Sequence, residues 1–400
     1  MYLPAWQGLG LRELCAIDRH ATLPFPFSAP NATYFHTARS AIYEVFRKLV
    51  ESGRCVVLMP DYHMGSEVGA IRHAGAQILW YPVTRRFDID MATLRCLCRD
   101  SGAHVLFVIH YAGWTQPMES LRDLCAQYGL VLFEDCALAL LSDVDGCSVG
   151  TYGDYAAFCL YKTIPLPDGA MLVQNRNVFD DLSTLPLLPP GRMFTAGRIV
   201  ELGIERLRSR DEPSGRVLAM AKQGIGRMLN LLRVERVPVG DTGFNPSHVN
   251  IAMASWSRRV LGCFDYEAIQ RRRRENFLRL RERLPDHAAV RTDLPPGVCP
   301  LFFPLLVADK SGASRALAQR GVMATELWNE GDPSVTGHEG PDAQFLRRHV
   351  LELPIHQDIT SPHIDYMARQ VRELNIVLPV RQPFAHDCKP RDETCRQAAV

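Results

Sequence analysis

The sequence lacks an excess of charge of either sign. Among its 400 residues, 45 are Lys or Arg and 44 are Asp or Glu, so the formal net charge at pH 7 is +1. A nucleic-acid-binding surface or a polybasic membrane anchor requires an excess of positive charge that this balance does not supply. The basic run at Arg271–Arg274 continues into a stretch of helical period and is interpreted as a solvated helix face. We therefore expect neither a nucleic acid nor a membrane as a partner.

Cysteine is sparse, and long apolar runs are absent. None of the 12 cysteines forms a Cys-x-x-Cys pair of the zinc or redox type, and the histidines show no metal-binding spacing. The N-terminal stretch has no basic start followed by an apolar run, and no apolar segment approaches the roughly 18 residues that span a bilayer. These absences predict a cytoplasmic protein without a disulfide framework or a metal site.

What the sequence does contain is the composition of a folded chain, with 47% hydrophobic and 22% charged residues. Short apolar runs alternate with stretches of helical period between residues 38 and 175. Continuously apolar strands separated by helices predict an α/β fold with a mostly parallel sheet, which binds ligands at the carboxyl ends of its strands. The expected strands lie at residues 55–60, 76–83, 104–111, 130–135, 155–161 and 170–174.

The pattern changes along the chain and suggests more than one structural unit. We predict a large α/β domain over residues 1–245, a smaller α+β domain over 246–385 and a tail over 386–400. Within the first domain, residues 216–234 have the period of a helix, although this stretch carries no functional signal.

The most informative residues stand at the ends of two predicted strands. Asp135 closes one apolar strand, and Lys162 follows another among apolar neighbours (Phe158, Leu160 and Ile164). A lysine that is desolvated there has a lowered pKa, which makes its amine available as a nucleophile toward a carbonyl. A lysine amine and a buried carboxylate are the two protein groups that pyridoxal phosphate (PLP) chemistry requires.

Several segments carry a more specific resemblance. The chain contains, in order, IHYAGWTQPM, FEDCALA, AFCLYK and LELPIHQDIT. Together these segments resemble the DegT/DnrJ/EryC1/StrS family of fold-type I PLP enzymes, which are mainly aminotransferases acting on nucleotide-linked keto sugars. The resemblance is clear over about residues 35–175 and fainter in the C-terminal part.

The resemblance implies a fold, a cofactor and the roles of two residues. The implied fold is a mostly parallel, seven-stranded type of sheet between helices. PLP is the implied cofactor, Lys162 falls at the Schiff-base lysine, and Asp135 falls at the partner of the pyridinium nitrogen. The implied partners are an amino donor such as glutamate and a keto acceptor. A homodimer with shared active sites is also implied.

The phosphate of the cofactor is expected at the N-terminus of the helix that begins ARSAIYEV, because a helix N-terminus favours an anion. Ala38 and Arg39 replace the Gly-Thr pair that is usual in the family, and Ala157 replaces a serine that often binds phosphate. Phosphate binding is therefore expected to depend on Ser40, the backbone and Arg39. The alternative is that Arg39 pairs elsewhere on the surface.

Two further departures affect contacts with the cofactor ring. Three positions after the aspartate, Leu138 stands where the family usually has a polar residue. Met64 replaces the aromatic residue that usually stacks on the cofactor ring. We expect Tyr62 or His63 to supply the face of the ring instead. Without these contacts the cofactor need not adopt its usual geometry. The amine of Lys162 and the carboxylate of Asp135, which the chemistry requires, are both retained.

Other residues are expected around the same site. GFNPSH, at residues 243–248, resembles the segment through which a neighbouring subunit contacts the active site, and Asn245 would be the contacting residue. The alternative for Asn245 is an ordinary Asn-Pro turn. His110 and Tyr111 follow a strand at the same edge as Asp135. Tyr111 is expected to line the substrate pocket, and His110 is expected either to line it or to orient a loop, with catalytic proton transfer as the less favoured alternative.

Three functions therefore stay open at this point. The first is a PLP-dependent aminotransferase that acts on a keto sugar or a related polar carbonyl compound. The second is a PLP-dependent lyase or dehydratase on a substrate that is not a sugar, although family dehydratases carry histidine where this chain has Lys162. The third is a non-catalytic binding module with the same fold.

Overall fold

Most of the chain is described by the computed structural model, which covers residues 1–15, 22–210, 243–332, 337 and 339–379. The helix expected at residues 216–234 and the tail expected at 386–400 lie outside the described residues. A helix long and apolar enough to cross a bilayer does not occur in the described ranges.

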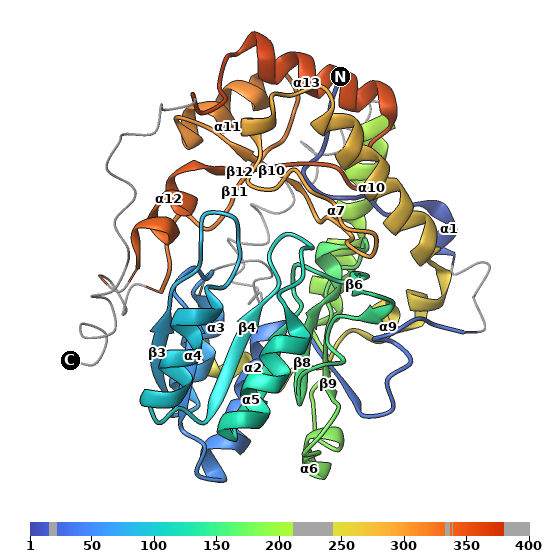
Figure 1. The fold of residues 1–400 in the computed structure, drawn as a ribbon. Helices are drawn as coiled ribbons and strands as arrows, with labels where there is room; N and C mark the ends of the chain where they lie inside the picture. Colours follow the sequence, from blue (N-terminus) through green and yellow to red (C-terminus); the bar gives the residue numbers. More distant parts are fainter. Residues whose placement is uncertain (16–21, 211–242, 333–336, 338, 380–400) are drawn as a thin grey trace, which may run out of the picture.

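A seven-stranded sheet forms the base of the molecule, with the strand order β1-β9-β8-β5-β4-β2-β3 (Figure 1). Only β9 runs antiparallel to its neighbours, and the other pairs from β8 to β3 are parallel. The strands are β1 (Ala32–Phe35), β2 (Val56–Pro60), β3 (Gln77–Tyr81), β4 (Val105–Ile109), β5 (Val131–Asp135), β8 (Tyr155–Cys159) and β9 (Ala170–Gln174).

Helices cover both faces of this sheet, which explains why its central strands are buried throughout. Every residue of β4, β5, β8 and β9 is buried. Helix α2 packs against β8, β9 and α3, while α4 packs against β3 and α5, so the two helix pairs lie on opposite faces (Figure 1). These helices are α2 (Ala38–Glu51), α3 (Ser66–His73), α4 (Met91–Asp100) and α5 (Met118–Tyr128).

The C-terminal part of the chain builds a second, smaller sheet with the order β10-β12-β11 and antiparallel pairing. Helices α11 and α13 lie above this sheet in Figure 1, with α10 beside them. The elements are α10 (Tyr266–Arg281), β10 (Phe303–Leu306), α11 (Lys310–Gln319), β11 (Thr325–Glu326), α12 (Pro341–His349), β12 (Val350–Leu353) and α13 (Ser361–Glu373).

The first residues of the chain pack against this C-terminal part. Leu3 pairs with Val322 in a parallel bridge, and the Gly8 N–H donates to Asp358 Oδ2 at 2.9 Å. The domain boundary at residue 245 stays a prediction, and these contacts show that residues near the N-terminus associate with the later segment.

Shorter elements connect the two sheets or extend from them. They are α1 (Leu11–Leu14), β6 (Asp143–Val144), β7 (Cys147–Ser148), η1 (Leu160–Lys162), α6 (Asp180–Ser183), α7 (Arg192–Arg210), η2 (Pro246–His248), α9 (Ser255–Val260), η3 (Leu261–Cys263) and η4 (Asp286–Ala288).

The basic run at residues 271–274 is not uniformly a solvated face. Arg273 is only 1% exposed, and its guanidinium donates to the carbonyls of Leu301 at 2.6 Å and Thr163 at 3.2 Å. The interpretation from sequence was wrong for this residue, because carbonyls from distant segments satisfy its donors inside the protein. Arg273 thereby links α10 to the residue that follows Lys162.

A tight junction joins the loop after β4 to the C-terminal part. The Leu301 N–H donates to the Ala112 carbonyl at 2.9 Å, and the Ser142 hydroxyl donates to the Gly113 carbonyl at 2.7 Å. Gly113 is buried with a φ of 106°, and a Cβ there would overlap the Cys299 carbonyl. Only glycine fits this position.

We expect Gly113→Ala to lower the free energy of unfolding by about 3 kcal/mol or more, because it combines positive-φ strain with a backbone overlap. Gly146→Ala is the matched control, since Gly146 has a φ of 84° but no atom within 4 Å of its added Cβ. That control should cost only about 1–2 kcal/mol. Urea unfolding of both variants measures the difference, and equal losses would show that the overlap is relieved.

Candidate active site

The register of the sheet brings the predicted lysine and aspartate to one edge. Asp135 ends β5 and is paired with Ala157 of the neighbouring parallel strand β8. After β8, the single turn of η1 ends at Lys162. Asp135 and Lys162 line the same pocket as a result.

The pocket contains part of the predicted site. The side chains that were expected there and do line it are Ala38, Arg39, Met64, Asp135, Leu138 and Lys162. The expected residues that do not line it are Ser40, Tyr62, His63, His110, Tyr111 and Asn245.

Asp135 is 7% exposed, and its environment disfavours the charged carboxylate. Burial raises the pKa of Asp135 from 3.8 to about 6, and the nearby charge of Glu67 acts in the same direction. A hydrogen bond from the Ala137 N–H to Oδ1, at 2.9 Å, opposes this shift, as does the charge of Lys162. Within the described chain, Oδ2 accepts no hydrogen bond, so one oxygen remains available to a ligand.

Lys162 is half-buried, which differs from the apolar burial that the sequence suggested. The apolar neighbours in sequence (Phe158, Leu160 and Ile164) belong instead to a hydrophobic cluster within the protein. The side chain of Lys162 faces the pocket with Cys159 and Leu138. Among the described residues, its amine makes no hydrogen bond or ion pair, so its lone electron pair, when deprotonated, is accessible.

The N-terminus of α2 borders the pocket and has the character of an anion site. Thr37 stands at the N-cap position of this 14-residue helix, but its side chain makes no capping hydrogen bond, and Thr37 lines the pocket. The Thr37 and Ser40 hydroxyls lie 3.1 Å apart, and Ser40 is buried beneath the pocket wall. Unsatisfied N–H groups and the helix dipole favour a negative group at this position.

Arg39 both lines the pocket and contacts a distant segment. Its guanidinium donates to the Gly243 carbonyl, so it is tied to the segment that contains Asn245. Asn245 itself is exposed and caps η2 by accepting from the Ser247 N–H at 3.0 Å. Its expected contact with a neighbouring subunit stays a prediction.

Glu67 is a pocket residue that the sequence did not reveal. It is 4% exposed, lies in the first turn of α3, and accepts from the Met64 N–H at 2.8 Å. Its position among apolar and helical residues gave no signal of a ligand-facing carboxylate. Because it lies near Asp135, it adds a second negative charge to the pocket.

The aromatic wall of the pocket comes from other residues than expected. Tyr62 is fully buried and stacks on Phe87, with 6.0 Å between the ring centroids. His63 stacks on Trp80, with 5.0 Å between the centroids. Both are therefore directed into the packing around β2 and β3, where their rings are shielded from the pocket.

The aromatic side chains that line the pocket are Tyr161 and Trp328. The Arg347 guanidinium donates to the Trp328 carbonyl at 3.1 Å, and the Trp328 backbone has a φ of 43°. Trp328 is far from Lys162 in sequence and lies in a loop, so no periodic pattern could have identified it.

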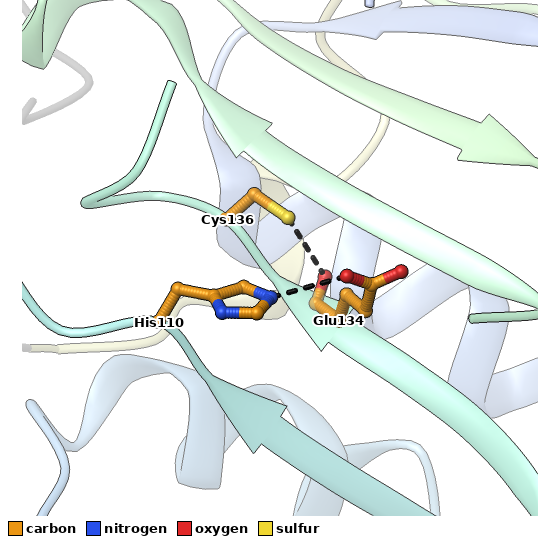
Figure 2. Close-up of side chains that lie close together, drawn as sticks. All are labelled: His110, Glu134 and Cys136. Carbon is orange, nitrogen blue, oxygen red and sulfur yellow. Dashed lines mark hydrogen bonds and ion pairs between the residues drawn. The ribbon is translucent and has the colours of Figure 1, made fainter. Parts of the chain in front are cut away.

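His110 forms a buried cluster with Glu134 and Cys136 (Figure 2). The Gln116 N–H donates to His110 Nδ1 at 3.2 Å, so Nε2 carries the proton and donates to Glu134 Oε2 at 3.1 Å. The neutral imidazole thus has both nitrogens occupied. Of the two expected roles, His110 does not line the pocket, whereas its hydrogen bond with the Gln116 N–H agrees with the orientation of a loop.

The same cluster has ligand atoms within 4.8 Å of one another, as a metal site would. However, Glu134 also accepts from the N–H groups of Gly150 at 2.9 Å and Gly153 at 2.5 Å. Burial raises the pKa of the Cys136 thiol well above its ordinary value, which disfavours the thiolate that binds metals. The geometry therefore favours a structural role.

Tyr111 is also directed away from the pocket. It is 1% exposed, and its hydroxyl donates to the Tyr62 carbonyl at 2.7 Å. Tyr111 therefore holds the segment after β2 in place rather than contacting a ligand.

Comparison with known proteins agrees with this architecture. A sequence model of the DegT/DnrJ/EryC1/StrS aminotransferase family matches residues 35–183. That segment, about 37% of the chain, is therefore similar to this family. The match includes both strand ends that carry Asp135 and Lys162, and it confirms the resemblance that the sequence motifs indicated.

Curated relatives match shorter segments. The GDP-perosamine synthase of Vibrio cholerae is 41% identical over 78 residues, which cover 19% of this chain and 21% of that protein. A dTDP-4-dehydro-2,3,6-trideoxy-D-glucose 4-aminotransferase of Saccharopolyspora spinosa is 29% identical over 123 residues, covering 29% of this chain and 30% of that protein. The matched segments thus span less than a third of these two relatives.

A solved structure extends the likeness to nearly the whole chain. The aminotransferase PseC of Helicobacter pylori, which is involved in the biosynthesis of pseudoaminic acid, superposes with a TM-score of 0.65. Its sequence is 14% identical, and the superposition covers 93% of this chain and 98% of that chain. The likeness shows the fold and confirms the predicted fold-type I α/β class.

We expect Asp135→Asn to stabilise the protein without cofactor while weakening cofactor binding. Because burial raises the pKa of Asp135 to about 6, its ionisation opposes folding. That penalty is absent below about pH 4, grows up to about pH 6 and is constant above. The variant should therefore gain about 2–3 kcal/mol of unfolding free energy above pH 6 and lose the gain toward pH 4.

Urea unfolding of wild type and variant across this pH range measures the effect. A difference between the two proteins that does not change with pH would contradict the raised pKa. Titration of both proteins with PLP measures the separate loss of cofactor affinity.

Proposed function

We propose that this protein is a PLP-dependent aminotransferase that transfers an amino group to a keto sugar or a related polar carbonyl compound. The observation that carries the proposal is the placement of the Lys162 amine and the Asp135 carboxylate in one pocket beside the N-terminus of α2. The family match over residues 35–183 supports it. An amino donor such as glutamate would complete the reaction.

The side chains present fit the chemical demands of PLP. Lys162 offers an amine without a hydrogen-bonding partner in the described chain, and Asp135 offers one unpaired carboxylate oxygen for the ring nitrogen. The uncapped start of α2 and Arg39 would hold the phosphate. When bound, PLP supplies an electron sink for the bonds of the amino carbon.

The reacting role of Lys162 follows from its position. Its Nζ would be the nucleophile that holds the cofactor through its carbonyl carbon. When an amine substrate has replaced it, the same Nζ would be placed to take up and return the proton of the substrate carbon. Leu138 and Trp328 line the pocket beside this amine.

Asp135 controls the charge of the ring nitrogen. Its carboxylate is expensive to bury alone, as its raised pKa shows, and a protonated ring nitrogen compensates that cost. The same pairing would keep the ring nitrogen protonated. Asp135 would therefore hold and polarise the cofactor through one contact.

A homodimer and a cytoplasmic location belong to the same proposal. Arg39 is joined to Gly243, so the segment that begins there lies beside the phosphate-binding end of the pocket. We infer that Asn245, exposed at this position, contacts the site of a second subunit.

A non-catalytic binding module is the second candidate, and Glu67 is the observation that favours it. A buried carboxylate in the pocket repels an anionic phosphate, and Ala157 provides no hydroxyl to offset it. This function requires that PLP bind weakly or not at all.

Borohydride reduction in the presence of PLP tests the proposal. We expect a stable pyridoxyl adduct on Lys162 and none on Lys310, whose amine donates to the Arg347 carbonyl at 2.7 Å. Lys162→Ala and Lys162→Arg should both lose the adduct, because neither has the primary amine, although the arginine keeps the charge. Peptide mapping by mass spectrometry locates the label.

The product of the reaction separates the remaining functions. An aminotransferase converts glutamate to 2-oxoglutarate and leaves the amino group on the protein-bound cofactor, which a change in the visible spectrum reports. An adduct on Lys162 without this conversion by glutamate or other amino donors would favour a lyase or dehydratase. No adduct at excess PLP would favour the binding module.

A further inference from the structure

A carboxylate from the small sheet faces the proposed reaction centre. Glu352 lies on β12, where it is paired with Pro304 of β10 and Thr325 of β11. Glu352 and Lys162 together line two neighbouring cavities, the larger of which continues from the cofactor pocket through Met64, Leu138 and Trp328. Their charges interact across this space. The sequence gave no signal of Glu352, because it stands in an apolar strand of the other sheet.

Glu352 has no structural task that accounts for its charge. It is half-buried, and in the described part of the chain its carboxylate accepts no hydrogen bond. Burial raises its pKa to about 7, which Lys162 and Lys310 counteract. A carboxylate left without partners in such a place is costly for folding, so a ligand that supplies donors would offset that cost.

The neighbouring lysines do not serve as its partners. The amine of Lys310 donates to the carbonyls of Leu327 at 2.5 Å and Arg347 at 2.7 Å. Lys162 makes no ion pair with Glu352 and is assigned to the cofactor in the proposed function. Glu352 therefore faces the cavity with its accepting oxygens available.

Other carboxylates around the larger cavity also favour a positively charged ligand. Its described lining includes the carboxylates of Glu201, Glu205, Glu326 and Glu330 in addition to Glu352. Besides Lys162, the described cation in this lining is Arg198, which is paired with Glu201 at 2.8 Å. The described wall favours a positively charged group over a phosphate.

The geometry points to Glu352 as a residue that determines specificity by accepting hydrogen bonds from a protonated amino group of the carbonyl acceptor. The substrate class is thereby a polyhydroxylated carbonyl compound that already carries an amino group and has no phosphate near the reacting carbon. This inference rests on the proposed aminotransferase function. It adds the recognition of a second nitrogen, which the reaction itself does not require.

Calorimetry tests the inference with matched probes on the PLP-loaded protein after borohydride has reduced the bond to Lys162, so that a probe amine cannot displace the lysine. Streptamine differs from scyllo-inositol only in two amino groups that replace hydroxyls, and UDP-glucose represents a nucleotide-linked sugar. We expect streptamine to bind at least tenfold more tightly than either other probe. Glu352→Gln, which keeps the shape and removes the charge, should weaken streptamine binding at least tenfold and leave scyllo-inositol binding within twofold.

Two further variants distinguish a direct contact between Glu352 and the ligand from the overall negative charge of the cavity. Glu330→Gln removes one charge at an exposed position of the same cavity and should change streptamine binding by less than twofold. Glu352→Asp keeps the charge and should retain more of the preference for streptamine than Glu352→Gln does. Thermal unfolding and the pyridoxyl adduct on Lys162 verify that each variant is folded and loaded.

The outcomes are distinct from those that test the function. Failure to form the adduct on Lys162 refutes the aminotransferase before any probe is added. With the adduct present, three results would each overturn the role of Glu352. They are equal binding of streptamine and scyllo-inositol, tighter binding of UDP-glucose than of streptamine, and equal effects of Glu352→Gln and Glu330→Gln.

Discussion

The buried carboxylate of Glu134 holds together the sheet edge on which the site is built. It accepts hydrogen bonds from the Gly150 and Gly153 N–H groups and from His110, which come from the loop before β8 and from the end of β4. A charge with no solvent exposure requires such partners, and the partners are fixed by it in turn. The end of β4, the end of β5 and the loop that enters β8 therefore keep one relative position, and this fixes the strand end at which Asp135 stands.

The adjacent carboxylates of Glu134 and Asp135 have different roles because their surroundings differ. Side chains alternate along a strand, so Glu134 is directed toward the His110 cluster while Asp135 is directed into the pocket. Glu134 is satisfied on both oxygens, whereas Asp135 has a raised pKa and a free oxygen. An ionisable group with a shifted pKa beside a pocket is typical of a functional site.

The C-terminal part of the chain completes the pocket rather than only covering it. Trp328 adds an aromatic wall, Glu352 adds a carboxylate, and Arg347 holds the Trp328 backbone. Arg273 joins α10 to the carbonyl next to Lys162, so the two parts of the chain are connected at the reaction centre itself. The residues that would distinguish one substrate from another thus come from the part of the chain in which family motifs are faintest.

The sequence alone determined the parallel sheet and the pair of Asp135 and Lys162, because apolar strands and the residues at their ends follow local patterns. It also located the helix start at Ala38, since the motif and the helical period coincide there. Only the tertiary structure decided which way each side chain is directed. Packing turned Tyr62, His63, His110 and Tyr111 into the protein and brought Glu67, Trp328 and Glu352 to the pocket. Such contacts join segments far apart in the chain, and no local periodicity encodes them.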